Sequence, residues 1–130
     1  MPANGDVLLD TSVVIPFFKG DKAIGAQLEN ATIYLPQTVL GELYCGACLS
    51  ANQTKNRNEI RNFLAAVTVL SSGITTAEHY GQIRAALAKA GTPIPENDIW
   101  IAALAVEHGL PLVARDAHFD LIAGLKILKW

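Results

Sequence analysis

Short apolar runs separated by longer helical segments are the feature that most limits the fold of this chain. Five runs occur, at 7–9, 32–35, 67–70, 112–114 and 126–128. Runs this short and this apolar are typical of strands buried on both faces. Because helical segments separate them, the pattern predicts an α/β fold with three layers, α/β/α, around a parallel sheet of about five strands.

Apolar residues between these runs recur at helical spacing. Three starting signals are predicted: Ser12 as the N-cap of the first helix, Thr75 with Glu78 as a capping box, and Asn97 as the cap of the last helix. The polar stretch 52–58 is a loop or a helix start. The predicted helices cover 12–20, 21–28, the segment around 39–47, 60–64, 75–91 and 99–109.

The length and composition fit one compact domain over residues 1–130. Hydrophobic residues make up 51% of the chain and charged residues only 17%, so a sizeable core is expected. No apolar run approaches the roughly 20 residues of a membrane helix. The first six residues also lack the basic start of a signal peptide. A cytoplasmic protein without a membrane partner is therefore expected.

The formal net charge of −2 disfavours a surface that attracts nucleic acid through general basicity. A nuclease whose acidic centre is neutralised by metal ions remains compatible with this charge.

Cys45 and Cys48 form a single C-x-x-C pair, and no second pair supplies the other two ligands of a zinc site. We expect two small buried thiols packed on one helix face.

Four acidic residues stand at places where apolar or small residues surround them. Asp10 directly follows the first apolar run, Glu42 and Asp98 lie among helical apolar residues, and Asp116 follows the run 112–114. Each alone could be a helix cap, a turn residue or a surface charge. However, ligands of open α/β sheets bind at the carboxyl ends of the strands, where the four could converge.

A cluster of carboxylates requires a compensating cation. At about 4 Å, two like charges repel by on the order of 4 kcal/mol at an effective dielectric of 20. Hard oxygen ligands without a histidine or cysteine pattern suit Mg²⁺ or Mn²⁺. Such ions can activate a water and stabilise charge on a phosphate oxygen, so the acids predict metal-dependent hydrolysis of phosphodiester bonds.

Around these acids the chain resembles the PIN-domain family and, within it, the VapC-type toxins of toxin–antitoxin pairs. The matching segments occur in the family's order and extend over almost the full length: LLDTSVVI, LGELYCGA, PENDIWIAALAVEHG and LVARDAHFDLIAGLKILKW. The resemblance implies a metal-dependent endoribonuclease with a five-stranded parallel sheet. It also implies a homodimer and a small antitoxin protein as partner.

The resemblance assigns Asp10, Glu42, Asp98 and Asp116 as the catalytic, metal-binding acids, with Ser12 orienting Asp10 or a water. Mg²⁺ or Mn²⁺ is the implied cofactor and RNA the implied substrate.

Two positions depart from the family pattern. Ala114 stands where Thr or Ser is common, and His118 stands where many relatives have a further acid. Arg115, His118 and Asp120 are the candidate substrate contacts, and Asp120 could also replace the missing acid. The departures motivate one alternative, a catalytically weak PIN-like module that mainly binds protein.

Two other enzyme classes fit poorly. A phosphatase with Asp10 as nucleophile needs an acid at Ser12, and a dinucleotide site needs a glycine-rich turn there.

Overall fold

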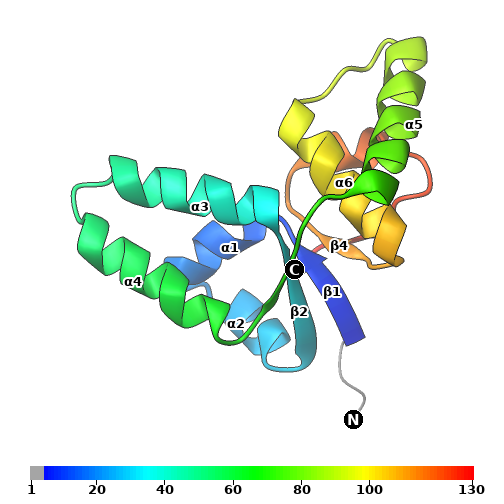
Figure 1. The fold of residues 1–130 in the computed structure, drawn as a ribbon. Coiled ribbons are helices and arrows are strands. Elements are labelled where there is room, and N and C mark those ends of the chain that lie inside the picture. Colours follow the sequence, from blue (N-terminus) through cyan, green and yellow to red (C-terminus); the bar gives the residue numbers. More distant parts are fainter. Residues whose placement is uncertain (1–4) are drawn as a thin grey trace.

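The computed structural model describes residues 5–130 and contains one five-stranded sheet (Figure 1). Its order is β3-β2-β1-β4-β5, and every neighbouring pair is parallel. The predicted α/β class and the five parallel strands are confirmed. The strands are β1 (Gly5–Leu9), β2 (Ala31–Pro36), β3 (Thr68–Leu70), β4 (Leu112–Val113) and β5 (Ile127–Leu128).

The helices lie on both sides of the sheet, which gives the predicted three layers. In Figure 1, α1 to α4 lie to the left of the strands, and α5 and α6 lie to the right. Right-handed crossovers put helices on opposite faces when the chain reverses its direction along the sheet. The helices are α1 (Thr11–Phe18), α2 (Lys22–Leu28), α3 (Gln37–Leu49), α4 (Gln53–Leu64), α5 (Ile74–Ala90) and α6 (Glu96–His108), with a 3-10 helix, η1 (Ala117–Leu121).

This reversal occurs beside β1. The chain passes from β1 to β2 and β3, then returns to place β4 on the other side of β1. Leu9 is in register with Val113, and the amide of Asp10 donates to the Val113 carbonyl at 3.0 Å. The segments that follow β1 and β4 therefore start side by side at the topological switch point, where open α/β sheets bind ligands.

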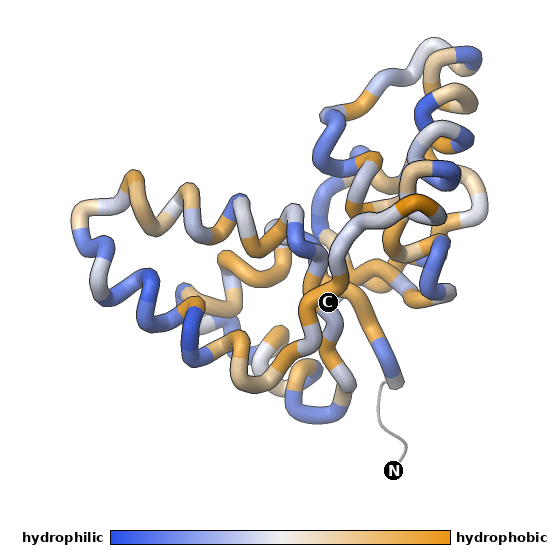
Figure 2. The backbone as a smooth tube through the Cα atoms, viewed as in Figure 1, coloured by the Kyte–Doolittle hydropathy of each residue, from blue (hydrophilic) through white to orange (hydrophobic). Residues whose placement is uncertain are grey.

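The core surrounds these two central strands. Residues 7–9 and 112–114 are fully buried, and five consecutive residues of α6, 101–105, are buried as well. Figure 2 shows the hydrophobic strands at the centre and hydrophilic stretches along α4 and α5. Within residues 5–130, none of the helices combines the length and the hydropathy needed to cross a lipid bilayer.

Two predicted helix caps are each wrong by two residues. Asp10, not Ser12, is the N-cap of α1, because its extended backbone lets its carboxylate accept from the Ser12 amide at 3.1 Å. Helix α6 has Pro95 at its N-cap and no side-chain cap, so Asn97 lies inside the helix. Asp98 thereby moves into the first turn of α6, close to the positive end of the helix dipole.

The predicted capping box of Thr75 and Glu78 is also wrong. Helix α5 begins at Ile74, one residue before the predicted range, and its N-cap is Gly73, two residues before Thr75. The Thr76 hydroxyl accepts from the Gly73 amide at 2.9 Å, and it donates to Glu107 on α6. Thr76 is fully buried, and a buried hydroxyl needs hydrogen-bond partners. Its two bonds join α5 to α6 and fix the start of α5.

The two cysteines are exposed, which corrects the expectation of buried thiols. The buried residues of α3 are Val39, Leu43 and Ala47, which repeat every four positions on one side of the helix. Cys45 and Cys48 fall outside that stripe. The polar stretch 52–58 is a helix start, since α4 begins at Gln53.

Candidate active site

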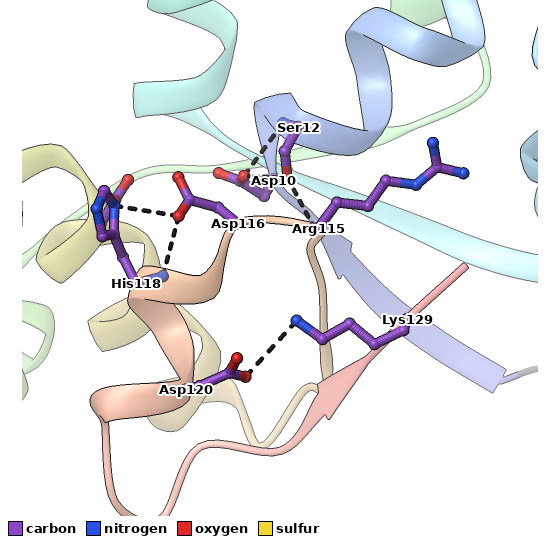
Figure 3. Close-up of polar contacts among 8 residues, drawn as sticks. Asp10, Ser12, Arg115, Asp116, His118, Asp120 and Lys129 are labelled. Atoms are coloured by element: carbon purple, nitrogen blue, oxygen red, sulfur yellow. Dashed lines mark hydrogen bonds and ion pairs between the residues drawn. The ribbon is translucent and has the colours of Figure 1, made fainter.

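Asp10 is held in a fixed orientation where β1 ends. It is 5% exposed, and its Oδ2 accepts from the Ser12 hydroxyl at 2.6 Å as well as from the Ser12 amide. The Ser12 oxygen in turn accepts from the Arg115 amide at 2.9 Å, next to β4 (Figure 3). Ser12 thus joins the segments after both central strands and holds one Asp10 oxygen by two hydrogen bonds.

Asp116 is positioned in the same way where β4 ends. It is the N-cap of η1, and its Oδ1 accepts from the His118 amide at 2.9 Å. The His118 imidazole lies against both carboxylates, with Nδ1 3.1 Å from Asp116 Oδ1 and 3.0 Å from Asp98 Oδ2. In the view of Figure 3, Asp116 lies between Asp10 and His118. The short helix η1 and the start of α6 therefore meet at this point.

The structure brings three possible metal ligands together. One donor atom each from Asp98, Asp116 and His118 lies within 4.8 Å of the other two. Two carboxylates and an imidazole are a donor set that divalent cations accept in proteins. The residues present therefore fit a divalent metal ion.

Glu42 and Asp10 lie outside this three-residue donor cluster but interact with it electrostatically. Glu42 on α3 accepts a hydrogen bond from the Thr11 hydroxyl at 2.9 Å. Burial raises the pKa of Glu42, and the charges of Asp10 and Asp98 raise it further, although Thr11 opposes this. The four predicted acids therefore face one region, and Asp98 and Asp116 are the pair in closest contact with His118.

Asp98 has a raised pKa for the same physical reason. Burial is the largest cause, the charges of Asp10 and Asp116 add to it, and the hydrogen bond with His118 opposes it. Because only 14% of the Asp98 side chain is exposed, water screens its charge poorly. Without a cation, ionising these acids costs folding free energy.

We expect Glu42→Gln to raise the melting temperature of the metal-free protein at pH 7. A raised pKa in the folded state means that the carboxyl favours folding while it is protonated, and this contribution is lost as the pH rises through its pKa. The amide keeps the acceptor for Thr11 and removes the charge. Thermal unfolding at pH 7 and pH 4.5 measures the effect, which should shrink at the lower pH.

Glu78→Gln is the matched control, because Glu78 is exposed on α5. It should leave both melting temperatures nearly unchanged. An equal or lower melting temperature for Glu42→Gln at pH 7 would contradict the raised pKa.

A groove extends from Glu42 along α1, α3 and α4. Its volume is about 340 Å³, and Lys19 and Lys55 line it together with apolar residues such as Ile15 and Phe18. Lys55 was not predicted to lie near the site, because α4 is polar along most of its length and no pattern distinguishes one of its residues from the others. Thr11 was also missed, although it lies between two predicted site residues, Asp10 and Ser12.

Comparison with known proteins identifies the fold. The family model of the PIN domain matches residues 7–125. The chain belongs to the PIN-domain family. This PIN domain is 35% identical to ribonuclease VapC2 of Haemophilus influenzae over 127 residues, which cover 95% of the chain and 96% of the relative. It therefore belongs to the VapC group within this family.

Two further matches cover nearly the whole PIN domain. The tRNA(fMet)-specific endonuclease VapC of Shigella flexneri is 32% identical over 95% of the chain and 96% of that relative. The crystal structure of VapBC2 from Rickettsia felis, bound to a DNA fragment from its promoter, has a TM-score of 0.90 at 27% identity. That match covers 96% of this chain and 98% of the solved one.

The remaining predicted residues of this PIN domain are engaged elsewhere. Asp120 forms an ion pair with Lys129 at 3.6 Å, so it does not join the donor cluster (Figure 3). The Arg115 side chain donates to the Trp130 carbonyl at 2.9 Å and to Asp21 at 3.2 Å. These contacts hold the Arg115 guanidinium between α2 and the end of the chain. Of the three candidate substrate contacts, His118 alone lies in the donor cluster.

Proposed function

We propose that this PIN domain is a metal-dependent endoribonuclease that acts as the toxin of a VapBC-type pair. It would hydrolyse RNA phosphodiester bonds with Mg²⁺ or Mn²⁺, and Asp10, Glu42, Asp98 and Asp116 would be its catalytic acids. The observation that carries the proposal is the meeting of Asp98 and Asp116 beside buried Asp10, at the carboxyl ends of β1 and β4. This is the edge at which α/β sheets bind ligands.

Each side chain has a separate task in this proposal. Asp98 and Asp116 supply the oxygen atoms that would hold the ion. Asp10, fixed by Ser12, keeps a buried negative charge at the centre of the site, and Glu42 adds a carboxyl group with a raised pKa beside the groove. When bound, a divalent ion supplies the positive charge that activates water and stabilises the charge developing on the phosphate.

The partners follow from the same family relationship. We propose an antitoxin protein and a second copy of the chain as partners, and one PIN domain over residues 1–130. The Rickettsia felis match is a structure of VapBC2, and the Shigella flexneri relative is specific for tRNA(fMet). Transfer RNA is therefore the first substrate class to test.

Incubating the purified protein with total tRNA tests the proposed function. We expect cleavage with Mg²⁺ or Mn²⁺, no cleavage in excess chelator, and recovery when the ion is restored. Expression of the protein alone should arrest growth. If pure, folded protein cleaves no RNA with either ion yet still binds a protein partner, the chain is a protein-binding module and the proposal is wrong.

A further inference from the structure

We propose that His118 is itself a ligand of the divalent ion, through Nδ1, and that it makes the site favour Mn²⁺ over Mg²⁺. This inference rests on the proposed function, because it assumes that the site binds a divalent ion. It gives a role to the position at which the sequence departs from the all-carboxylate pattern.

The distances between donor atoms carry the proposal. His118 Nδ1 lies 3.0 Å from Asp98 Oδ2 and 3.1 Å from Asp116 Oδ1. Neighbouring ligands of an octahedral ion with bonds of about 2.1 Å lie about 3.0 Å apart. The imidazole nitrogen is thus separated from both carboxylate oxygens by the distance expected for ligands of one ion.

The backbone brings the imidazole to this place. The His118 amide donates to Asp116, so the residue that supplies the nitrogen also orients one of the carboxylates. Both belong to the segment of η1, whereas Asp98 comes from α6, and these two elements are in contact. The His118 side chain is 47% exposed, so it is not placed there by burial in the core.

The chemistry of the nitrogen predicts the metal preference. Mg²⁺ is a hard ion that favours oxygen ligands, whereas imidazole is a usual ligand of transition-metal ions. Exchanging a carboxylate for an imidazole also removes one negative charge from the site. The lost charge weakens the binding of both ions, whereas the nitrogen ligand weakens Mg²⁺ more than Mn²⁺. Mn²⁺ is the probe because bound nitrogen can be detected directly on it.

The other two histidines provide controls. His79 lines a cavity between α5 and the segment 121–124, and His108 lies at the opposite end of α6 from Asp98, 3.8 Å from Glu107. Neither belongs to the donor cluster. A nitrogen signal that depends on His118 alone therefore identifies this site.

Pulsed electron paramagnetic resonance on the Mn²⁺-loaded full chain tests the proposal. We expect coupling to a ¹⁴N nucleus in the wild type and in His79→Asn, and its loss in His118→Asp and His118→Asn. Calorimetric titration should show that His118→Asp lowers the preference for Mn²⁺ over Mg²⁺ by about tenfold or more, the size of effect typical of altered metal surroundings. Circular dichroism checks that the variants are folded.

Three outcomes would overturn the proposal. Mn²⁺ that binds without nitrogen coupling, or coupling that persists in both His118 variants, excludes Nδ1 as a ligand. If His118→Asp leaves the preference for Mn²⁺ over Mg²⁺ unchanged, His118 has no role in metal selectivity. In these cases chelator-sensitive RNA cleavage would still support the proposed function. If the wild type binds neither ion, both proposals fail together.

Discussion

Replacing Asp98 with asparagine should lower the rate of RNA cleavage by roughly 100-fold or more, the effect of removing a group that acts electrostatically in an active site. Asp98 Oδ2 is part of the donor cluster, and the side chain is mostly buried. The amide has nearly the same shape and a neutral charge, so it should weaken metal binding without creating a cavity. Single-turnover cleavage of tRNA at saturating Mn²⁺ measures the loss.

The matched control for this variant is Asp120→Asn. Asp120 is 55% exposed and pairs only with Lys129 among the residues described here, so the same chemical change should leave the rate within about twofold, because exposed ion pairs contribute little. Metal-free Asp98→Asn should also melt at a higher temperature than the wild type at pH 7, since a buried charge with a raised pKa is removed. A folded Asp98→Asn protein that cleaves at the wild-type rate would exclude Asp98 from the mechanism.

Replacing Phe119 with alanine should reduce the free energy of unfolding by about 3–5 kcal/mol, the usual cost of emptying a large buried aromatic site. Phe119 is fully buried and lies in η1, next to His118 in the sequence. It anchors the helix that presents Asp116 to the site. Urea unfolding monitored by circular dichroism gives the loss of stability.

Leu121→Ala serves as the control in the same short helix. Leu121 is 50% exposed, so its truncation should cost less than about 1 kcal/mol, as expected for a residue that is only partly buried. Equal losses for the two variants would contradict the view that Phe119 is the anchor of η1.

The sheet was predictable because its signal is local and strong. All five apolar runs became strands, and each observed strand overlaps its predicted run. The change of direction that places β4 beside β1 was harder to predict. The sequence pattern gives the order of the strands along the chain but not their order in the sheet. The convergence of Asp10 with Asp116 nevertheless followed from the general placement of ligands at the carboxyl ends of parallel strands.

Side-chain detail was harder to predict than topology. Gly73 is the N-cap of α5 although it has no side chain that could cap the helix. The Thr76 hydroxyl, from within the helix, accepts a hydrogen bond from the Gly73 amide instead. Cys45 looked buried from its residue type, yet the buried stripe of α3 passes along another side of the helix. The position of His118 between two carboxylates depends on how η1 meets α6, which no local pattern encodes.

The most direct test of the metal centre measures binding and cleavage on the same preparation. Mn²⁺ is titrated by calorimetry and, in parallel, tRNA cleavage is followed over the same range of concentration, for the wild type and for Asp98→Asn combined with Asp116→Asn. We expect the midpoints of binding and cleavage to coincide in the wild type, and both signals to disappear in the double variant. Cleavage that continues at full rate in excess chelator, or unchanged Mn²⁺ affinity in the double variant, would contradict a catalytic metal at this site.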